Sequence, residues 1–275
     1  MSGNTGLACD GITIRYGGYS AVRDLSFRAP RGRLTGLIGP NGAGKTSTFN
    51  ACSGLLSPTA GQLALDGRDL SGMSPAARAR LGLGRTFQRM ELFLDLTVAE
   101  NVRLGREAAM GGANPIRHVL RSRRDRAEVA RVTADAIALC GLEALAETSV
   151  SELSTGQRRL VELARVVAGG FTTLLLDEPS SGLDETESER FGAILTQLIR
   201  ERGLGILLVE HDMALVMGIC EYLYVLDFGQ LIFEGTAREV RASEVVRAAY
   251  LGADDMAGIE AGTTTNAWGE HHAEA

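Results

Sequence analysis

One segment of eight residues constrains the fold of this chain more than any other. Residues 39–46 read Gly-Pro-Asn-Gly-Ala-Gly-Lys-Thr and fit the pattern G-x-x-x-x-G-K-[ST], directly after the short apolar run Leu34–Ile38. Glycines let the backbone N–H groups of such a loop turn inward toward an anion, and the positive end of a following helix strengthens the attraction. The segment therefore predicts a strand, a phosphate-binding loop and a helix that begins near Lys45.

The loop also contains the only lysine of the chain, although Lys and Arg together number 28. We expect the compact ammonium of Lys45 to contact the β- and γ-phosphates, where a planar guanidinium would not fit. The hydroxyl of Thr46 is a ligand suited to Mg²⁺. The expected nucleotide-binding residues of the loop are Asn41, Gly42, Ala43, Gly44, Lys45, Thr46 and Ser47.

Bulk properties narrow the class of protein. A length of 275 residues allows one large domain or a core with an inserted subdomain, and a net charge of −6 argues against a general nucleic-acid binder. The four cysteines lie far apart without a CxxC pair, which favours reduced thiols in a cytosolic protein. No apolar run reaches the roughly 18 residues needed to span a bilayer, and the N-terminus lacks an apolar signal core. A membrane role would therefore come through a partner.

Patterning along the chain predicts an α/β fold with additions. Alternating residues near the N-terminus indicate antiparallel strands, and apolar strands that alternate with helices farther on indicate a parallel sheet. The expected organisation is an ATP-binding core with an antiparallel β subdomain over residues 7–88 and 159–252, and an inserted helical subdomain over residues 89–158. The polar segment 253–275 is expected to be a disordered tail.

Two carboxylates follow the apolar strand that ends at Leu176. Asp177 and Glu178 come at the strand's carboxyl end, where α/β sheets place ligands. We expect Asp177 to hold Mg²⁺ through water and Glu178 to polarise the attacking water. An apolar strand followed by Asp-Glu is common in proteins, so the pairing with the phosphate loop carries this interpretation.

Residues 153–157, Leu-Ser-Thr-Gly-Gln, indicate a second anion-binding helix end. Ser154 and Gln157 form a capping box, which is a sufficient structural explanation by itself. Gly156 and the free N–H groups of this helix end could also bind a phosphate. Because the first loop already encloses one side of a nucleotide, the second end is expected to serve the ATP of another subunit.

Four single residues complete the candidate set. Gln88 could reach Mg²⁺ or the attacking water, and His211, which follows the apolar strand 206–209, could donate to the γ-phosphate. Tyr16 could stack on adenine. Asp184 is expected first to cap its own helix, with Glu187 completing the capping box, and is also a candidate nucleotide-binding residue. Each also has an ordinary reading as a satisfied polar or core residue.

The order of these motifs resembles the nucleotide-binding subunit of ATP-binding cassette (ABC) transporters from about Leu7 to Gly252. Tyr16 matches the aromatic loop, residues 39–46 the Walker A motif and Gln88 the Q-loop. Residues 153–157 match the signature, Asp177 and Glu178 Walker B, residues 181–184 the D-loop, and His211 the switch histidine. The resemblance implies a P-loop ATPase of the ABC type, with ATP sandwiched in a head-to-tail dimer. Thr155 departs from the usual glycine, whereas Gly156 is retained.

A narrower resemblance is to the ATPase subunits of branched-chain amino-acid importers, through residues 85–93, 97–102, 209–217 and 249–252. It implies a cytoplasmic subunit, peripheral on the inner face of the cell membrane, that hydrolyses ATP with Mg²⁺. The implied partners are two transmembrane permeases, a second ATPase subunit, homologous or identical, and indirectly an extracytoplasmic solute-binding protein. No nucleic-acid partner is expected.

Two alternatives remain open at the level of sequence. One is the related ATPase of lipopolysaccharide export, whose switch segment typically lacks the Glu-His-Asp-Met run of residues 210–213. The other is a non-transport ABC ATPase that acts on nucleic acid or ribosomes. The short interval between loop and signature, without heptads, disfavours the repair and chromosome types, and the single cassette disfavours the translation types. The arginine cluster of residues 117–126 lacks the aromatic residues that stack bases.

Overall fold

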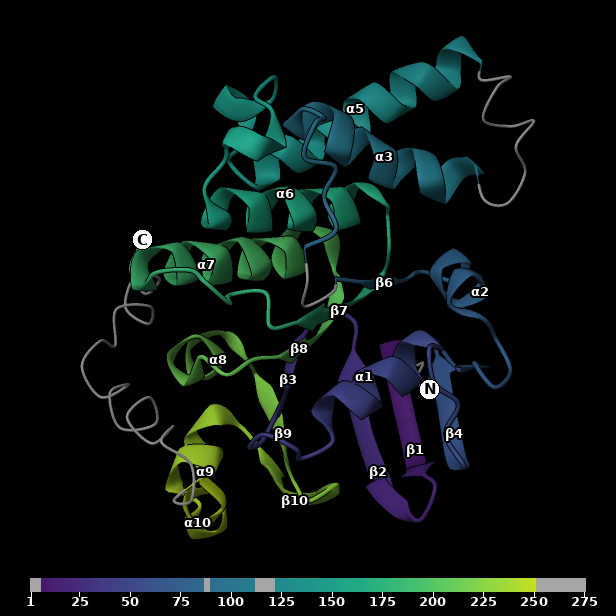
Figure 1. Ribbon diagram of the computed structural model, residues 1–275, viewed down its shortest axis with the longest axis vertical. Coiled ribbons are helices and arrows are strands. Elements are labelled where there is room, and N and C mark those ends of the chain that lie inside the picture. Colours follow the sequence, from purple (N-terminus) through teal and green to yellow (C-terminus); the bar gives the residue numbers. More distant parts are fainter. Residues whose placement is uncertain (1–5, 87–89, 112–121, 251–275) are drawn as a thin grey trace, which may run out of the picture.

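A six-stranded sheet lies at the centre of the computed structural model, which describes residues 6–86, 90–111 and 122–250 (Figure 1). Neighbouring strands are parallel except for the antiparallel pair at one edge. In spatial order the strands are β10 (Gln230–Gly235), β9 (Tyr222–Asp227), β3 (Leu34–Ile38), β8 (Gly205–Val209), β7 (Thr173–Asp177) and β6 (Leu83–Arg85). Since β3, β8, β7 and β6 run in one direction, their carboxyl ends meet at one edge of the sheet.

The two faces of this sheet belong to different hydrophobic cores. Alternate residues of each strand point to opposite faces; thus Leu174 and Leu176 of β7 lie in one core, whereas Leu175 lies in the other. Strands β3, β7 and β8 are buried at every position, as expected for parallel strands covered on both sides. The functional edge is therefore held by a rigid central layer.

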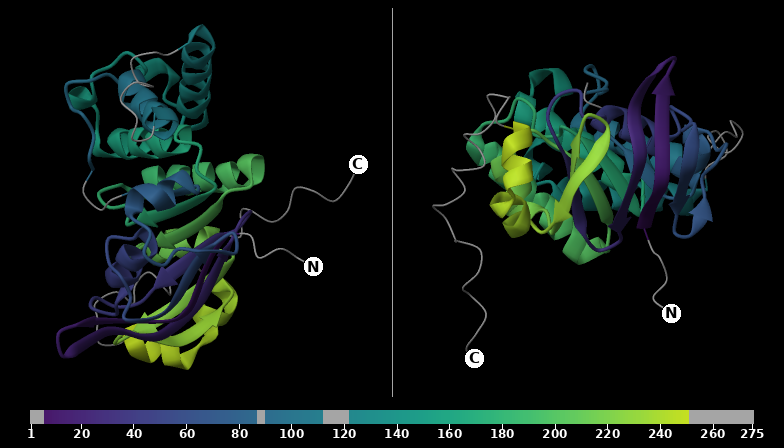
Figure 2. Two further views of the ribbon diagram at one scale, coloured as in Figure 1. Left: turned by 90° about the vertical axis from the view of Figure 1, so that its right-hand side faces the viewer. Right: turned by 90° about the horizontal axis from the view of Figure 1, so that it is seen from below.

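A second sheet is antiparallel, as the sequence predicted, and Figure 1 shows that it packs beside helix α1 (Lys45–Ser53). Its strands, in spatial order, are β2 (Tyr19–Pro30), β1 (Gly6–Tyr16), β4 (Ala60–Leu65) and β5 (Arg68–Asp69). Tyr16 and Tyr19 pair at the tip of the β1–β2 hairpin, on either side of the Gly17–Gly18 turn. Figure 2 shows this hairpin as a long projection from the lower part of the molecule.

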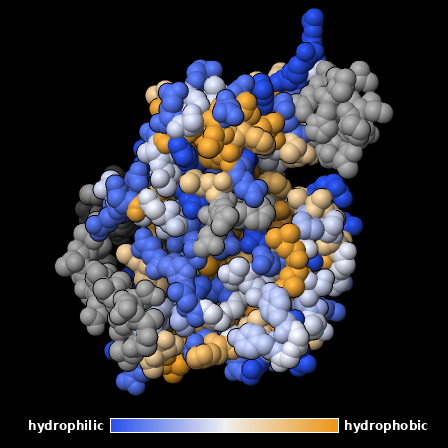
Figure 3. Space-filling view, in the orientation of Figure 1, coloured by the Kyte–Doolittle hydropathy of each residue, from blue (hydrophilic) through white to orange (hydrophobic). Residues whose placement is uncertain are grey.

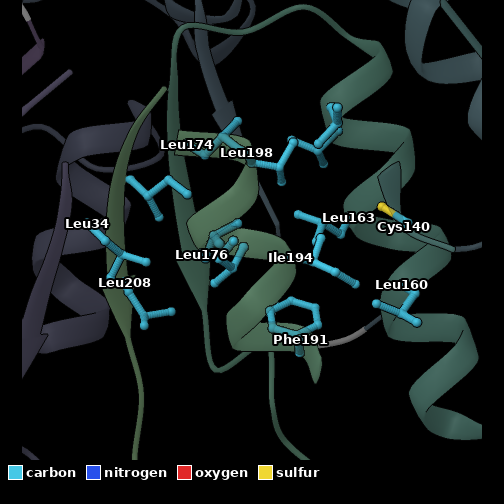
Figure 4. Close-up of a cluster of buried hydrophobic side chains, with 14 of the residues drawn as sticks. Leu34, Cys140, Leu160, Leu163, Leu174, Leu176, Phe191, Ile194, Leu198 and Leu208 are labelled. Atoms are coloured by element: carbon cyan, nitrogen blue, oxygen red, sulfur yellow. The ribbon is translucent and has the colours of Figure 1, made fainter. Parts of the chain in front are cut away.

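A helical layer covers the other face of the central sheet. It consists of α3 (Val98–Gly111), α5 (Arg123–Leu139), the short 3₁₀ segments η1 (Glu143–Leu145) and η2 (Val150–Glu152), α6 (Thr155–Ala168) and α7 (Glu185–Arg202). Figure 4 shows Phe191, Ile194 and Leu198 of α7 between the sheet leucines and the α6 residues Leu160 and Leu163. The predicted boundary between helical subdomain and core at residues 158/159 falls inside α6, which packs against both.

The remaining helices lie at the periphery. They are α2 (Pro75–Arg80), α8 (Met213–Ile219), α9 (Ala237–Ala242) and α10 (Glu244–Tyr250). Within the part of the chain described, no helix combines the length and the apolar character that crossing a membrane requires. Gln88 and the predicted tail at residues 253–275 lie outside the described residues.

Candidate functional site

A cavity of about 330 Å³ lies at the carboxyl edge of the central sheet. It brings together segments that are up to 195 positions apart in the chain, from Tyr16 to His211. Its lining consists of Tyr16, Tyr19, Ala21, Asn41, Gly42, Ala43, Gly44, Lys45, Thr46, Ser47, Glu178 and His211. All predicted nucleotide-binding residues of the loop are in this set.

The loop between β3 and α1 is shaped by backbone that only glycine adopts easily. Gly39, Gly42 and Gly44 have φ values of 148°, 82° and 98°. A Cβ at Gly39 would lie 2.0 Å from the carbonyl oxygen of Leu226, and one at Gly44 would lie 2.6 Å from that of Ala21. The neighbouring strands thus enforce the loop's conformation as well as its glycines.

Helix α1 points its N-terminus into the cavity. Gly44 is the N-cap of α1 and has no side chain that could accept hydrogen bonds from the N–H groups of the first turn. Because these N–H groups point toward the N-terminal end of the helix, they are available to a ligand at the loop. The buried ammonium of Lys45 donates to the carbonyl oxygens of Gly39 at 2.5 Å and Pro40 at 2.9 Å. Oriented N–H groups, a helix end and a fixed cation make this loop a strong anion site.

Two tyrosines border the cavity on the side of the β1–β2 hairpin. Tyr16 is about half exposed, and its hydroxyl lies 3.4 Å from the Ser47 hydroxyl, which places it over the start of α1. Tyr19, its cross-strand partner, is slightly more exposed and also lines the cavity. Two open aromatic rings beside an anion site suit a ligand that carries a flat ring next to phosphates.

Glu178 and His211 form a hydrogen-bonded pair in the cavity wall. Oε1 of Glu178 and Nε2 of His211 are 2.8 Å apart, although the residues follow different strands, β7 and β8. Glu178 has a φ of 48°, which is unusual for a residue with a side chain and indicates a position fixed by its surroundings. Its N–H donates to the carbonyl oxygen of Val209 at 2.8 Å, which anchors that conformation.

Asp177 lies behind this pair in a buried ion pair. Nη2 of Arg85 donates to its Oδ2 at 3.0 Å, with less than a tenth of either side chain exposed. Burial raises the pKa of the Asp177 carboxyl, and the Arg85 charge and hydrogen bond oppose that shift. Nη1 of Arg85 also bonds Oδ1 of Asn50 and the hydroxyl of Ser53 at 2.8 and 2.7 Å, so the guanidinium ties α1 to β7.

The donor set fits Mg²⁺ in its chemistry. Mg²⁺ prefers oxygen ligands, and the Thr46 hydroxyl and the Glu178 carboxylate face the same cavity. Asp177 ends the adjacent strand, with Oδ2 engaged by Arg85. A water-mediated contact from Asp177, as the sequence predicted, remains compatible with this arrangement.

The second predicted anion site lies outside the cavity lining. Ser154 and Gln157 form the predicted capping box at the start of α6, with bonds of 3.2 and 2.9 Å. Gly156 is buried, and a Cβ on it would lie 2.3 Å from Oε1 of Glu187. Glu187 in turn forms the predicted capping box with Asp184 at the start of α7. The starts of α6 and α7 therefore touch within one chain.

Sequence reasoning missed three residues of this site. Tyr19 follows the Gly17–Gly18 turn, and a two-residue hairpin signal would have paired it with Tyr16. Arg85 and Glu210 are buried charges whose partners are distant in sequence; no local pattern identifies them. Glu210 accepts a hydrogen bond from the N–H of Ser180 at 2.6 Å.

Comparison with known proteins identifies related families and related sequences. Residues 22–181 match the family model described as ABC transporter, and residues 230–256 match the one described as branched-chain amino acid ATP-binding cassette transporter. The chain is 36% identical over 248 residues to the high-affinity branched-chain amino acid transport ATP-binding protein LivG of Salmonella typhimurium, covering 90% of this chain and 97% of LivG. It is 34% identical over 249 residues to the corresponding protein BraF of Pseudomonas aeruginosa, with the same coverage of 90% and 97%.

Two further similarities bear on function and fold. The lipopolysaccharide export system ATP-binding protein LptB of Acidithiobacillus ferridurans is 36% identical over 231 residues, or 84% of this chain and 90% of LptB. Among solved structures, the ADP conformation of an ATP-binding cassette of an ABC transporter superposes with a TM-score of 0.78 at 26% identity. That match covers 90% of this chain and 98% of the other.

Proposed function

This chain belongs to the ABC transporter family as an ATP-hydrolysing subunit, and from that premise we propose that it energises the uptake of branched-chain amino acids. The same role would apply to the uptake of a related small solute. The observation that carries it is the match of residues 230–256 to the branched-chain amino acid cassette model, in addition to the general cassette match. LivG and BraF, which are named for this transport, are similar over nine tenths of this chain.

In the proposed mechanism the loop holds the triphosphate. N–H groups of residues 41–47 and the ammonium of Lys45 bind the phosphates, and Tyr16 stacks on the adenine. Glu178 accepts a hydrogen bond from the attacking water and orients it at the γ-phosphorus, while His211 holds Glu178 and the γ-phosphate. The electrostatic field of the preorganised donors stabilises the charge that develops during transfer.

Mg²⁺ would be held by the Thr46 hydroxyl and through water by Asp177, with Gln88 as a further predicted ligand. When bound, it would neutralise negative charge on the phosphates. Arg85 positions the Asp177 carboxylate for this role through its 3.0 Å bond.

The subunit is proposed to work as half of a dimer. Ser154, Gly156 and Gln157 lie outside the cavity of their own chain, which supports their assignment to the nucleotide of a second ATPase subunit. Asp184, at the start of α7 beside them, would lie at the same interface.

The remaining partners are two transmembrane permeases and, indirectly, an extracytoplasmic solute-binding protein. The segment before α3 exposes the apolar side chains of Phe93 and Leu94, and Figure 3 shows apolar surface over the layer of α3 and α6. We assign this surface to contact with the permeases, which would place the subunit on the cytoplasmic face of the membrane. No nucleic-acid partner is proposed.

Lipopolysaccharide export ranks second. LptB is as similar in identity as LivG, but the similarity spans a smaller share of both chains, and the C-terminal match names branched-chain amino acid transport. A non-transport ATPase acting on nucleic acid or ribosomes has no support among the relatives described above.

Purification of the tagged chain from membranes of its native host tests the proposal. Two permeases and an ATPase partner should co-purify, and vesicles containing the complex should take up labelled leucine when ATP is inside with the chain. Uptake of urea or of another amino acid in place of leucine would assign a different solute to the transporter. Recovery of ribosomes, DNA or lipopolysaccharide-transport proteins without permeases of the importer type would overturn it.

A further inference from the structure

Glu210 is a buried carboxylate that joins two loops of the site. Only 3% of the residue is exposed, and no cationic side chain pairs with it among the hydrogen bonds and ion pairs of the described residues. Oε1 accepts the N–H of Ser180 at 2.6 Å, and Oε2 accepts the N–H of His211 at 3.0 Å. The first N–H belongs to the loop after β7, and the second to the loop after β8.

Backbone hydrogen bonds stabilise the Glu210 carboxylate in its buried position. Burial raises the pKa of Glu210, and hydrogen bonds from Ser180, His211 and Asp212 oppose the shift. A buried carboxylate is stabilised only if hydrogen bonds replace its hydration, and here backbone N–H groups supply them. Removing the carboxylate would leave N–H groups of both loops without their acceptor, which loosens both loops at once.

The two loops have different tasks. The loop after β8 carries His211, whose Nε2 lies 2.8 Å from Glu178 in the cavity. The loop after β7 runs from Glu178 through Ser180 to Asp184, the N-cap of α7, and Glu187 in the first turn of α7 lies against Gly156 of α6. A displacement of the loop after β8 therefore reaches the helix ends assigned to the partner's nucleotide only if this loop moves together with the loop after β7.

We propose that Glu210 is a positioning residue that makes these two loops one unit, so that nucleotide binding in the cavity orders the start of α7 in the same subunit. Through Glu187 and Gly156 this order extends to the start of α6. The inference rests on the proposed function, because it assumes that the cavity binds ATP.

Hydrogen exchange of the full chain tests this coupling. Amide exchange is followed by mass spectrometry with and without Mg²⁺ and the non-hydrolysable analogue AMP-PNP, at concentrations where sedimentation shows a monomer. In the unchanged protein, AMP-PNP should slow exchange in residues 39–52 and in residues 180–187. In Glu210→Gln the first protection should persist, whereas the second should weaken by about fivefold or more, as for a typical coupling between sites.

Glu221→Gln is the matched control, since its side chain is 53% exposed and forms an ion pair with the surface residue Arg33 at 3.2 Å. It should behave as the unchanged protein. If Glu210→Gln no longer binds AMP-PNP, Glu210→Asp is measured by the same criterion, because it keeps the charge and is too short to reach both loops.

The outcomes separate the inference from the proposed function. Protection of residues 180–187 that persists in the Glu210 variants, or that is absent in the unchanged protein while residues 39–52 are protected, overturns the role of Glu210. Absence of any AMP-PNP protection in residues 39–52 of the unchanged protein contradicts the proposed function instead.

Discussion

At the scale of single residues, the conformation of Glu178 is the most unusual feature of the site. A φ of 48° in a residue with a side chain costs about 1 kcal/mol or more, and such positions concentrate where chemistry requires a fixed side chain. The strain places Oε1 within 2.8 Å of His211 and in the cavity wall. We therefore assign the orientation of the attacking water to this carboxylate.

Replacement Glu178→Gln tests that assignment. The amide keeps the size and the polar contact with His211 but accepts protons poorly, so ATP hydrolysis should fall about 10²–10⁴-fold. ATP binding should persist, and the variant should accumulate a closed, nucleotide-bound dimer that size-exclusion chromatography with ATP detects. Normal turnover in this variant would remove Glu178 from the role of general base.

Arg85 makes a prediction about stability. Replacement Arg85→Met leaves Asp177 buried without its cation and removes the bonds to Asn50 and Ser53, so the free energy of unfolding should fall by about 3 kcal/mol. Urea unfolding measures the change. The control is Arg131→Met, which removes an exposed pair with Asp135 on α5 and should change stability by less than about 0.5 kcal/mol. Equal effects of the two replacements would contradict the importance assigned to burial.

At the scale of elements, the start of α6 has two constraints where the sequence suggested one. Gly156 was expected to allow close approach of a partner's nucleotide, and the structure adds a contact within the chain, because Glu187 occupies the space of a side chain. A side chain at position 156 would therefore have to displace the Glu187 carboxylate even in the isolated subunit.

Gly156→Asp should impair hydrolysis while ATP binding to the monomer remains. The new carboxylate meets the Glu187 carboxylate, and like charges at this distance repel and disturb both helix starts. Binding of a fluorescent ATP analogue and steady-state hydrolysis are measured in parallel. Gly218→Asp on α8, where a Cβ meets nothing within 4 Å, should leave both unchanged. A loss of monomer binding in Gly156→Asp would contradict the assignment of α6 to the partner's nucleotide.

The elements also show what a sequence can predict. Capping boxes at Ser154 and Asp184 are confirmed because their partners lie three residues away. The loop at residues 39–46 was predicted for the same reason, because its pattern lies within consecutive residues. Arg85 with Asp177, and Glu210 with Ser180, join residues 92 and 30 positions apart, so they depend on strand order that the sequence does not state. The contact of Gly156 with Glu187 depends on how two helices pack, which is a property of the tertiary structure.

At the scale of the whole molecule, the central sheet separates two cores, and each contains buried thiols. Cys52 lies in the core beside α1, and Cys140 in the core of the helical layer. Burial raises the pKa of Cys52 and of Cys140 to about 12 each. None of the four cysteines is paired, so no disulfide links the elements of either core.

This arrangement predicts a specific alkaline instability. The folded-state pKa is raised, so the contribution of each thiol to stability is complete below its ordinary value near 9 and is lost as the pH rises toward about 12. In that window the unfolded chain releases protons that the folded chain retains, which lowers the free energy of unfolding by about 1.4 kcal/mol per pH unit for each such thiol. Urea unfolding at a series of alkaline pH values measures the slope.

Cys52→Ala and Cys140→Ala provide the comparison, because each removes one thiol while the other ionisable groups remain. Either variant should be less stable than the unchanged protein at neutral pH, owing to lost packing, yet should lose stability less steeply above about pH 9. The stability curve of each variant should therefore converge with that of the unchanged protein as the pH rises. Parallel curves would show that the thiol ionises as easily in the folded protein as in the unfolded chain. That result would contradict the burial of the thiol in the core.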